Sequence, residues 1–100
     1  MEQASTGLAK IFRDLLEHAP PHEIPLIAWP VVCGEKVASR TRAVLFVNHV
    51  LWVEVPDQPW KLQLMELAHQ YVAALNTLGG ERVTRVEFLM PGEKPQQPNS

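Results

Sequence analysis

The hydrophobic period of the sequence changes from two to about three and a half between Val50 and Leu78, across one turn marked by Pro56. The segment before the turn, Leu51 to Val55, consists mostly of β-branched, aromatic and aliphatic residues, which is typical of a strand. Proline ends a strand because it lacks the backbone donor that the ladder needs. The sequence therefore predicts a strand that passes directly into a helix.

After the turn, the large apolar residues recur at steps of three or four, as they do along one face of a helix. These residues are Trp60, Leu64, Leu67, Tyr71, Leu75 and Leu78. Asp57 is suited to the N-cap, and Gly79-Gly80 ends the pattern. We therefore expect one long helix of about five turns, packed between a sheet and other helices.

The chain before residue 42 has helical periodicity interrupted by prolines. The first helix is expected to present one apolar face and to end near Ala19, before Pro20-Pro21. That face comprises Leu8, Ile11, Phe12, Leu15 and Leu16. A second helical segment spans Ile24 to Cys33, where Pro30 should kink or restart the helix. One more helical turn is expected at Glu35–Ser39, after Gly34.

Three strands are predicted: Arg42 to Val47, Val50 to Val55, and Val83 to Met90, the first two joined by a two-residue turn at Asn48-His49. In this register Phe46 pairs with Leu51, Val44 with Val53, Leu45 with Trp52, Val47 with Val50, and Ala43 with Glu54. The core face then carries Val44, Phe46, Leu51, Val53, Val86 and Phe88. The predicted fold is α+β, in the order α-α-β-β-α-β, with the helices on one face of the sheet.

The domain is expected to span residues 6–90, followed by a disordered polar tail at 91–100. At 100 residues and 46% hydrophobic residues, the chain suffices for one domain with an ordinary core. It shows no signal peptide and no apolar run long enough to span a membrane, so a cytoplasmic location is expected.

Chemistry-bearing residues are few. The four histidines, His18, His22, His49 and His69, are scattered and lack metal-ligand spacing, so neither a metal nor another cofactor is expected. The single cysteine, Cys33, lies among apolar residues and is interpreted as a small packing residue rather than a nucleophile. The sequence therefore favours a protein that is not an enzyme.

Basic residues concentrate at the entry to the first strand, in Lys36, Arg40 and Arg42, and again in Arg82 and Arg85. These cations could contact phosphates while bases stack on Trp52 on the outer face of the sheet, so together they are a candidate surface for single-stranded nucleic acid. The alternative is that nearby glutamates offset these charges, and the formal net charge of −2 supports that interpretation.

On the outer face, Leu45, Val47, Val50 and Trp52 are expected to form an exposed apolar patch, a feature seldom left uncovered in a monomer. It could be covered by a second copy of the chain, a partner protein, the C-terminal residues, or bases stacked on Trp52 with Arg85 near their phosphates. Glutamates on the same face favour protein contact, so Trp52, Leu45 and Val47 are the expected partner-binding residues.

The run from Trp29 to Arg42, WPVVCGEKVASRTR, resembles the W-x-x-V-V-G-x-x-I-A-x-x-T segment of the DciA family of bacterial replicative-helicase operators and loaders. The strand Leu51 to Val55, the Trp60 and Leu64 pair, and Leu75-Asn76 resemble further segments of that family in the same order. The resemblance covers about residues 8 to 90.

The resemblance implies a KH-like, non-enzymatic domain that acts in DNA replication, interacts with the hexameric replicative helicase, and binds single-stranded or forked DNA. The resemblance implies DNA contacts at Lys36, Arg40 and Arg42 and adds Lys61 to them. Arg85 is a fifth expected contact because of its place beside Trp52. A homodimer is a further expected assembly, and no membrane contact is expected. The alternative function is a protein-interaction module without nucleic-acid contact.

Overall fold

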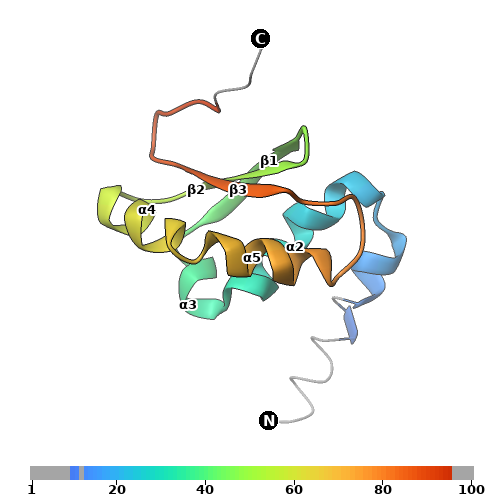
Figure 1. Cartoon of the computed structure of the whole chain (residues 1–100). Coiled ribbons are helices and arrows are strands. Elements are labelled where there is room, and N and C mark those ends of the chain that lie inside the picture. Colours follow the sequence, from blue (N-terminus) through green and yellow to red (C-terminus); the bar gives the residue numbers. More distant parts are fainter. Residues whose placement is uncertain (1–9, 12, 96–100) are drawn as a thin grey trace, which may run out of the picture.

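A three-stranded sheet organises the fold. The computed structural model describes residues 10, 11 and 13–95. The strands β1 (Arg42–Val47), β2 (Val50–Glu54) and β3 (Arg85–Leu89) lie in the spatial order β1-β2-β3. β1 pairs with β2 in antiparallel and β2 with β3 in parallel orientation. Helices lie on one face of this mixed sheet (Figure 1), which confirms the predicted α+β class.

The helical elements confirm the predicted order, with the last helix divided. Residues 10–11 and 13–18 are helical. The 3-10 turn η1 (Pro21–Glu23) leads into α2 (Ile24–Cys33), followed by α3 (Glu35–Ala38). Between β2 and β3 lie α4 (Gln58–Met65) and α5 (Ala68–Asn76). Pro30 lies inside α2 and does not end it; the chain leaves the helix at Gly34, which has a φ of 89°.

The β1–β2 turn confirms the expected hairpin. Asn48 and His49 have φ angles of 54° and 65°, the left-handed conformation that a two-residue hairpin turn requires. The predicted pairs of Leu45, Phe46 and Val47 with their partners on β2 are all present.

The register shifts between Ala43 and Leu45, and two predicted pairs are therefore wrong. Ala43 pairs with Val53 in place of Val44, and Arg42 pairs with Glu54 in place of Ala43. The cause is a bulge, in which one extra residue on β1 has no partner on β2. Val44 is consequently exposed rather than part of the core face.

The single long helix predicted after β2 is wrong, because the chain turns at Glu66-Leu67 and forms α4 and α5. The amide of Leu67 donates to the carbonyl of Leu64 at 2.9 Å, a three-residue step that tightens and redirects the helix. A straight helix of 20 residues would be about 30 Å long, whereas a five-residue strand spans about 17 Å. The break allows both halves to pack on the sheet.

The main core lies between the sheet and the helices. Trp29, on α2, is 1% exposed and makes edge-to-face contacts with Tyr71 and Phe88, with ring centroids 4.9 and 6.3 Å away. Val86 and Phe88 face this core, as predicted. Trp60 packs at its margin.

The first helix does not pack as predicted. Ile11 and Leu15 are 59% and 53% exposed, and Leu16 is half-buried. Leu8 and Phe12 lie outside the described residues. A helical period alone does not specify whether the rest of the chain provides a surface for the apolar face.

The connection from α5 to β3 is held by Asn76. Its amide nitrogen donates to the carbonyl of Val83 at 2.9 Å, and its amide oxygen accepts from the Val83 amide at 2.8 Å. Val83 is 1% exposed although it precedes β3, which begins two residues later than predicted. Gly80 has a φ of 80° and lies against η1 and the start of α2, where its missing Cβ leaves room.

Candidate partner and nucleic-acid interface

The outer face of the sheet carries a second, smaller hydrophobic cluster. Its buried members are Val50, Trp52 and Leu89, and Leu45 and Val47 pack against them. The shared face was predicted correctly, but the expected exposure was wrong for Val50 and Trp52, each of which is 8% exposed. Leu45 and Val47 are half-buried and are the apolar side chains of this cluster that a partner could contact.

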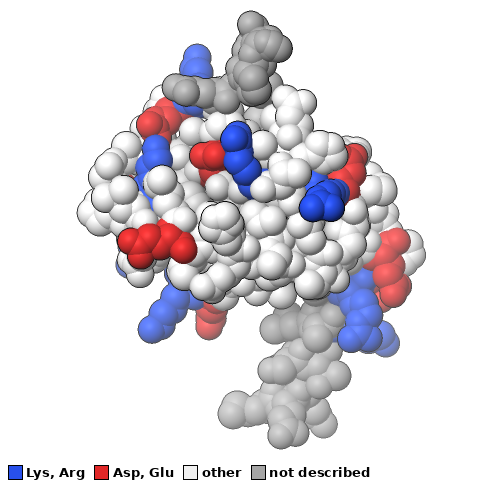
Figure 2. All heavy atoms as spheres, in the orientation of Figure 1, with Lys and Arg blue, Asp and Glu red and all other residues white. Residues whose placement is uncertain are grey.

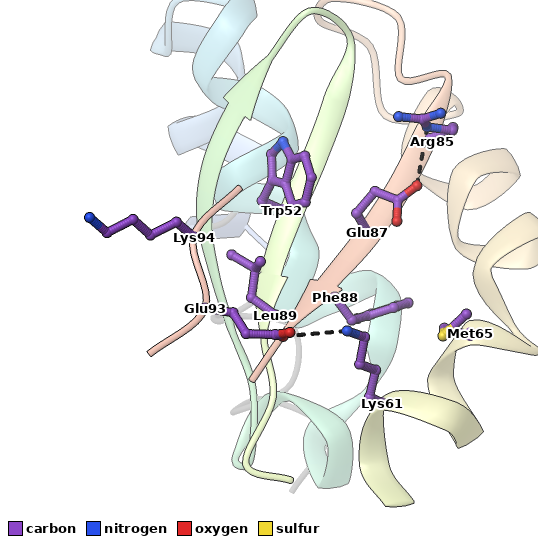
Figure 3. Close-up of a pocket in the computed structure, with 9 residues that line it drawn as sticks. All are labelled: Trp52, Lys61, Met65, Arg85, Glu87, Phe88, Leu89, Glu93 and Lys94. Carbon is purple, nitrogen blue, oxygen red and sulfur yellow. Dashed lines mark hydrogen bonds and ion pairs between the residues drawn. The ribbon is translucent and has the colours of Figure 1, made fainter. Parts of the chain in front are cut away.

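A groove of about 420 Å³ opens beside this cluster, and we refer to it as the outer groove. Figure 3 shows its walls, which come from β2, β3, α4 and the segment after β3. The lining residues are Trp52, Lys61, Met65, Arg85, Glu87, Phe88, Leu89, Glu93 and Lys94. The fold thus brings together three of the predicted site residues, Trp52, Lys61 and Arg85.

Acidic side chains pair with two of the cations in the outer groove. Arg85 Nε lies 3.2 Å from Glu87 Oε2, and Lys61 Nζ lies 3.3 Å from Glu93 Oε1. Glu93 Oε1 also accepts a hydrogen bond from the Met90 amide at 2.6 Å. This amide, together with Lys61, holds the pKa of the Glu93 carboxyl below its ordinary value. Glu93 therefore stays ionised at neutral pH and offsets the charge of Lys61.

The remaining predicted cations lie in and after α3, where Lys36, Arg40 and Arg42 form what we call the basic corner. Trp29 fixes the local backbone, because its indole Nε1 donates to Thr41 Oγ1 at 3.0 Å and that hydroxyl donates to the Val37 carbonyl at 2.7 Å. Arg40 and Arg42 line a shallow cavity of about 270 Å³.

The basic corner is only partly offset by acidic groups. Arg42 Nη2 lies 3.4 Å from Glu54 Oε1, and both side chains are exposed. Within the described part of the chain, neither Lys36 nor Arg40 forms an ion pair. Figure 2 shows basic and acidic side chains interspersed over the face that it presents. Three of the five predicted nucleic-acid contacts, Arg42, Lys61 and Arg85, are thus paired with glutamates.

Glu93 and Lys94 were not predicted as site residues, because the sequence placed them in a polar tail. Glu93 pairs with Lys61 on α4, and Lys94 lines the same groove. Pro91 lines the cavity at the basic corner. The alternation of polar residues and prolines gives no signal for these contacts, since Lys61 and Glu93 are 32 positions apart.

The structure provides no reactive centre at Cys33. Burial raises the pKa of its thiol from 9.0 to about 11, so the nucleophilic thiolate is scarce at neutral pH. Among the described residues, no three His, Cys, Asp or Glu side chains are arranged to hold a metal ion. In the same part of the chain, no helix has the length and apolarity needed to cross a membrane.

The sequence of this chain matches a known protein family. The family model described as "Dna[CI] antecedent, DciA" matches residues 6–88. This range extends into β3 and includes the basic corner, Trp52, Lys61 and Arg85. The family is associated with DNA replication and helicase loading. No curated protein matches the chain.

Proposed function

We propose, because this chain belongs to the DciA family, that it is a non-enzymatic adaptor of DNA replication that contacts the replicative helicase and helps to place it on DNA. The observation that carries the proposal is the extent of the family match, residues 6–88 of 100. The match includes every buried residue of the main core, two of the three buried residues of the outer cluster and nearly all of the sheet, so it concerns the whole domain rather than one motif.

The helicase contact is proposed for the outer face of the sheet, where the half-buried Leu45 and Val47 lie against the buried Trp52. An apolar centre bordered by charged side chains is typical of protein interfaces. The borders here are Lys61, Arg85 and Lys94 with their neighbouring glutamates. Trp52 supports the contact by holding the cluster in place and exposes little of its own surface.

Single-stranded DNA is proposed as an auxiliary ligand, bound by cations that remain free of glutamate partners. Lys36, Arg40 and Lys94 meet that condition among the described residues. Each phosphate contact with single-stranded DNA contributes a slope of about −0.7 to a plot of log K against log salt concentration. Three contacts predict a slope of about −2, much shallower than that of a strongly basic DNA-binding protein.

A protein-interaction module without nucleic-acid contact is the second candidate. The observation that favours it is the pairing of Arg42, Lys61 and Arg85 with glutamates 3.2 to 3.4 Å away. Phosphate would have to displace these carboxylates or approach them, and like charges repel at short range. In this case the helicase contact remains and the DNA contact is absent.

Calorimetric titration of the full chain with the replicative helicase of the same organism tests the first candidate. Leu45→Glu should weaken binding by at least about tenfold, because it places a charge in the apolar centre of the interface. Val31→Glu is the matched control, since Val31 is 53% exposed and lies on α2, away from the sheet's outer face. Absence of helicase binding would refute the proposed function.

A salt titration with labelled single-stranded and forked DNA separates the two candidates. The unaltered chain should give the slope of about −2, and the double variant Lys36→Ser with Arg40→Ser should reduce it to about −0.7. Lys10→Ser, at an exposed position on the first helix, is the control. Helicase binding without DNA binding at low salt would establish the protein-interaction module.

A further inference from the structure

The third strand leaves one edge of the sheet open. β3 pairs with β2 on one side only, since the order is β1-β2-β3. The Leu89 carbonyl, at the end of β3, accepts from the Val55 amide at 2.7 Å and so points toward β2. Backbone groups of successive strand residues point to alternate sides, so those of Val86 and Phe88 point away from β2. Among the described residues, these groups have no backbone partner.

The opposite edge of the sheet, formed by β1, is irregular. β1 contains the bulge at Val44, which interrupts the regular spacing of its backbone groups. Bulges protect sheet edges because they remove the flat template that another strand needs. β3 has five residues in continuous register with β2 and no such interruption. The two edges are therefore unequal, and β3 is the one suited to pairing.

A groove of about 210 Å³ runs along the free edge of β3, and we call it the edge groove. One wall is formed by Thr84 and the first three residues of β3, Arg85 to Glu87; the other comes from the end of α4 and from α5. The residues on the helical wall are Met65, Ala68, His69 and Val72. Ala68 and Val72 belong to the main core and are half-buried, while Met65 is 51% exposed. The helical layer thus extends past the last strand.

A strand added at this edge would gain two kinds of contact. Its backbone would pair with the free groups of Val86 and Phe88, and its inward side chains would lie on Met65, Ala68 and Val72. The outward residues would lie beside Arg85 and Glu87, which share the outer face at an Nε to Oε2 distance of 3.2 Å. These two charges can restrict which sequence binds.

We propose that the edge groove binds an extended peptide segment of a partner protein, as an antiparallel fourth strand. Directly opposite residues share a face, so the residue opposite Val86 points into the groove and is apolar. The residue opposite Glu87 is basic and the residue opposite Arg85 is acidic. The segment therefore reads basic–apolar–acidic, with further apolar residues at alternate positions. Antiparallel pairing is chosen because it is slightly more stable per residue.

A second copy of this chain does not fit the same groove. Pairing of two β3 strands about a two-fold axis perpendicular to the sheet would put the helices of both copies on one side. Each copy's α5 already forms the wall beneath its own free edge. Both α5 helices would then need the space of a single groove, whereas an extended segment brings no helix.

This inference goes beyond the proposed function, because it requires neither DNA nor the helicase. The probe is the acetylated and amidated peptide Ser-Val-Lys-Ile-Glu-Val-Ser, titrated into the full chain. Bound peptide should slow hydrogen exchange at the amides of Val86 and Phe88, and leave exchange in β1 unchanged. In the proposed orientation the peptide's Ile amide, opposite Val86, points to β3, and its Glu amide, opposite Arg85, points away.

Methylation of single peptide nitrogens tests this orientation without changing the side chains. Methylation at Ile should weaken binding about tenfold or more, because it removes an edge hydrogen bond and adds a clash, and methylation at Glu should change it less than about twofold. Met65→Glu in the protein should also weaken binding about tenfold. Leu62→Glu is the matched control, since Leu62 lies on the same helix and is 53% exposed, outside the groove.

Several results would overturn the proposal. One is the absence of peptide binding at about 1 mM, a concentration at which weak segments still associate. Another is equal weakening by the two methylations, since the contact would then not be a strand pair. A third is concentration-dependent dimerisation of the chain that Met65→Glu abolishes, because the edge would then belong to a second copy. Retained helicase binding alongside any of these would leave the proposed function standing.

Discussion

Truncation of Trp52 to alanine should destabilise the domain substantially, although this residue lies on the sheet face opposite the helices. Its side chain is 8% exposed and packs with Val50 and Leu89. A buried tryptophan removes about 150–250 Å² from water, which at about 25 cal/mol per Å² amounts to about 4–6 kcal/mol as an upper bound. Removal of a core Trp or Phe side chain to alanine typically costs about 3–5 kcal/mol.

The expected loss for Trp52→Ala is about 3 kcal/mol, the lower end of that range. The outer cluster is small and borders the outer groove, so the space left by the indole would open to water. Such a space lacks the additional penalty of a closed cavity. Trp29→Ala, in the main core, should cost about 5 kcal/mol because it also leaves the Thr41 hydroxyl without its indole donor.

Urea denaturation followed by far-ultraviolet circular dichroism measures this loss without depending on tryptophan fluorescence. In thermal unfolding followed by the same signal, a loss of about 3 kcal/mol should lower the Tm of a domain of this size by about 12–24 °C. Trp52→Phe is the matched control and should lose only about 1 kcal/mol, since an aromatic ring remains in the cluster. A loss below about 1 kcal/mol in Trp52→Ala would refute the packing argument and restore the exposed patch that the sequence predicted.

Three further measurements probe other parts of the fold. Gly80→Ala should lower the free energy of unfolding by about 2–3 kcal/mol, because the new Cβ would lie 2.8 Å from the Pro21 carbonyl oxygen at a φ of 80°. Gly79→Ala, at a φ of 91° but with open space around the new Cβ, should lower it by only about 1 kcal/mol in the same denaturation assay. Asn76→Ala should lose about 1–3 kcal/mol, since it removes the two hydrogen bonds, 2.9 and 2.8 Å long, that bridge the α5–β3 loop, and a Tm unchanged within error would contradict this role. Cys33, with its pKa raised from 9.0 to about 11, should react with iodoacetamide at pH 8 about 100-fold more slowly than in the urea-unfolded chain, and equal rates would contradict its burial.

Local patterns in the sequence were sufficient to predict the hairpin turn and the inward face of the third strand. Asn48 and His49 predicted a two-residue hairpin turn, and both adopt the required positive φ. Alternation in the third strand placed Val86 and Phe88 toward the helices, and both are buried there. These features depend on neighbouring residues and on a period of two, which the sequence displays directly.

The bulge in β1 could not be predicted, because alternation is unchanged by one unpaired residue until its partner strand is known. Val44 has the same apolar, β-branched character as the core residue Val53 opposite which it was expected. In the structure Ala43 occupies that position and Val44 is 37% exposed. The small side chain of Ala43 lies among core residues such as Val37 and Val55, where packing space, rather than hydrophobicity, decides which residue points inward.

The break between α4 and α5 could not be predicted either, because the local pattern does not change there. The residues from Trp60 to Leu78 keep helical spacing throughout, and no Gly or Pro marks Glu66 or Leu67. The turn follows from the dimensions of the sheet, which a helical period does not encode. As a consequence Leu67 sits at the start of α5 and is half-buried, so it is not the fully buried residue that the straight helix implied.

The electrostatic character of the outer groove depends on partners distant in sequence, and this is why composition left two functions open. Lys61 appears in the sequence as a free cation on a helix, but Glu93, 32 positions later, lies 3.3 Å from it. The Met90 amide holds the same carboxylate and keeps it ionised. A phosphate entering beside Trp52 would therefore meet a nearly balanced set of charges rather than a basic surface. Glu93→Gln should remove that balance: single-stranded DNA binding should then strengthen and gain about −0.7 in salt slope, while the helicase contact at Leu45 and Val47 should change little. If the salt slope stays the same, Lys61 does not face the DNA, and the balance of charge in the groove is not what limits binding.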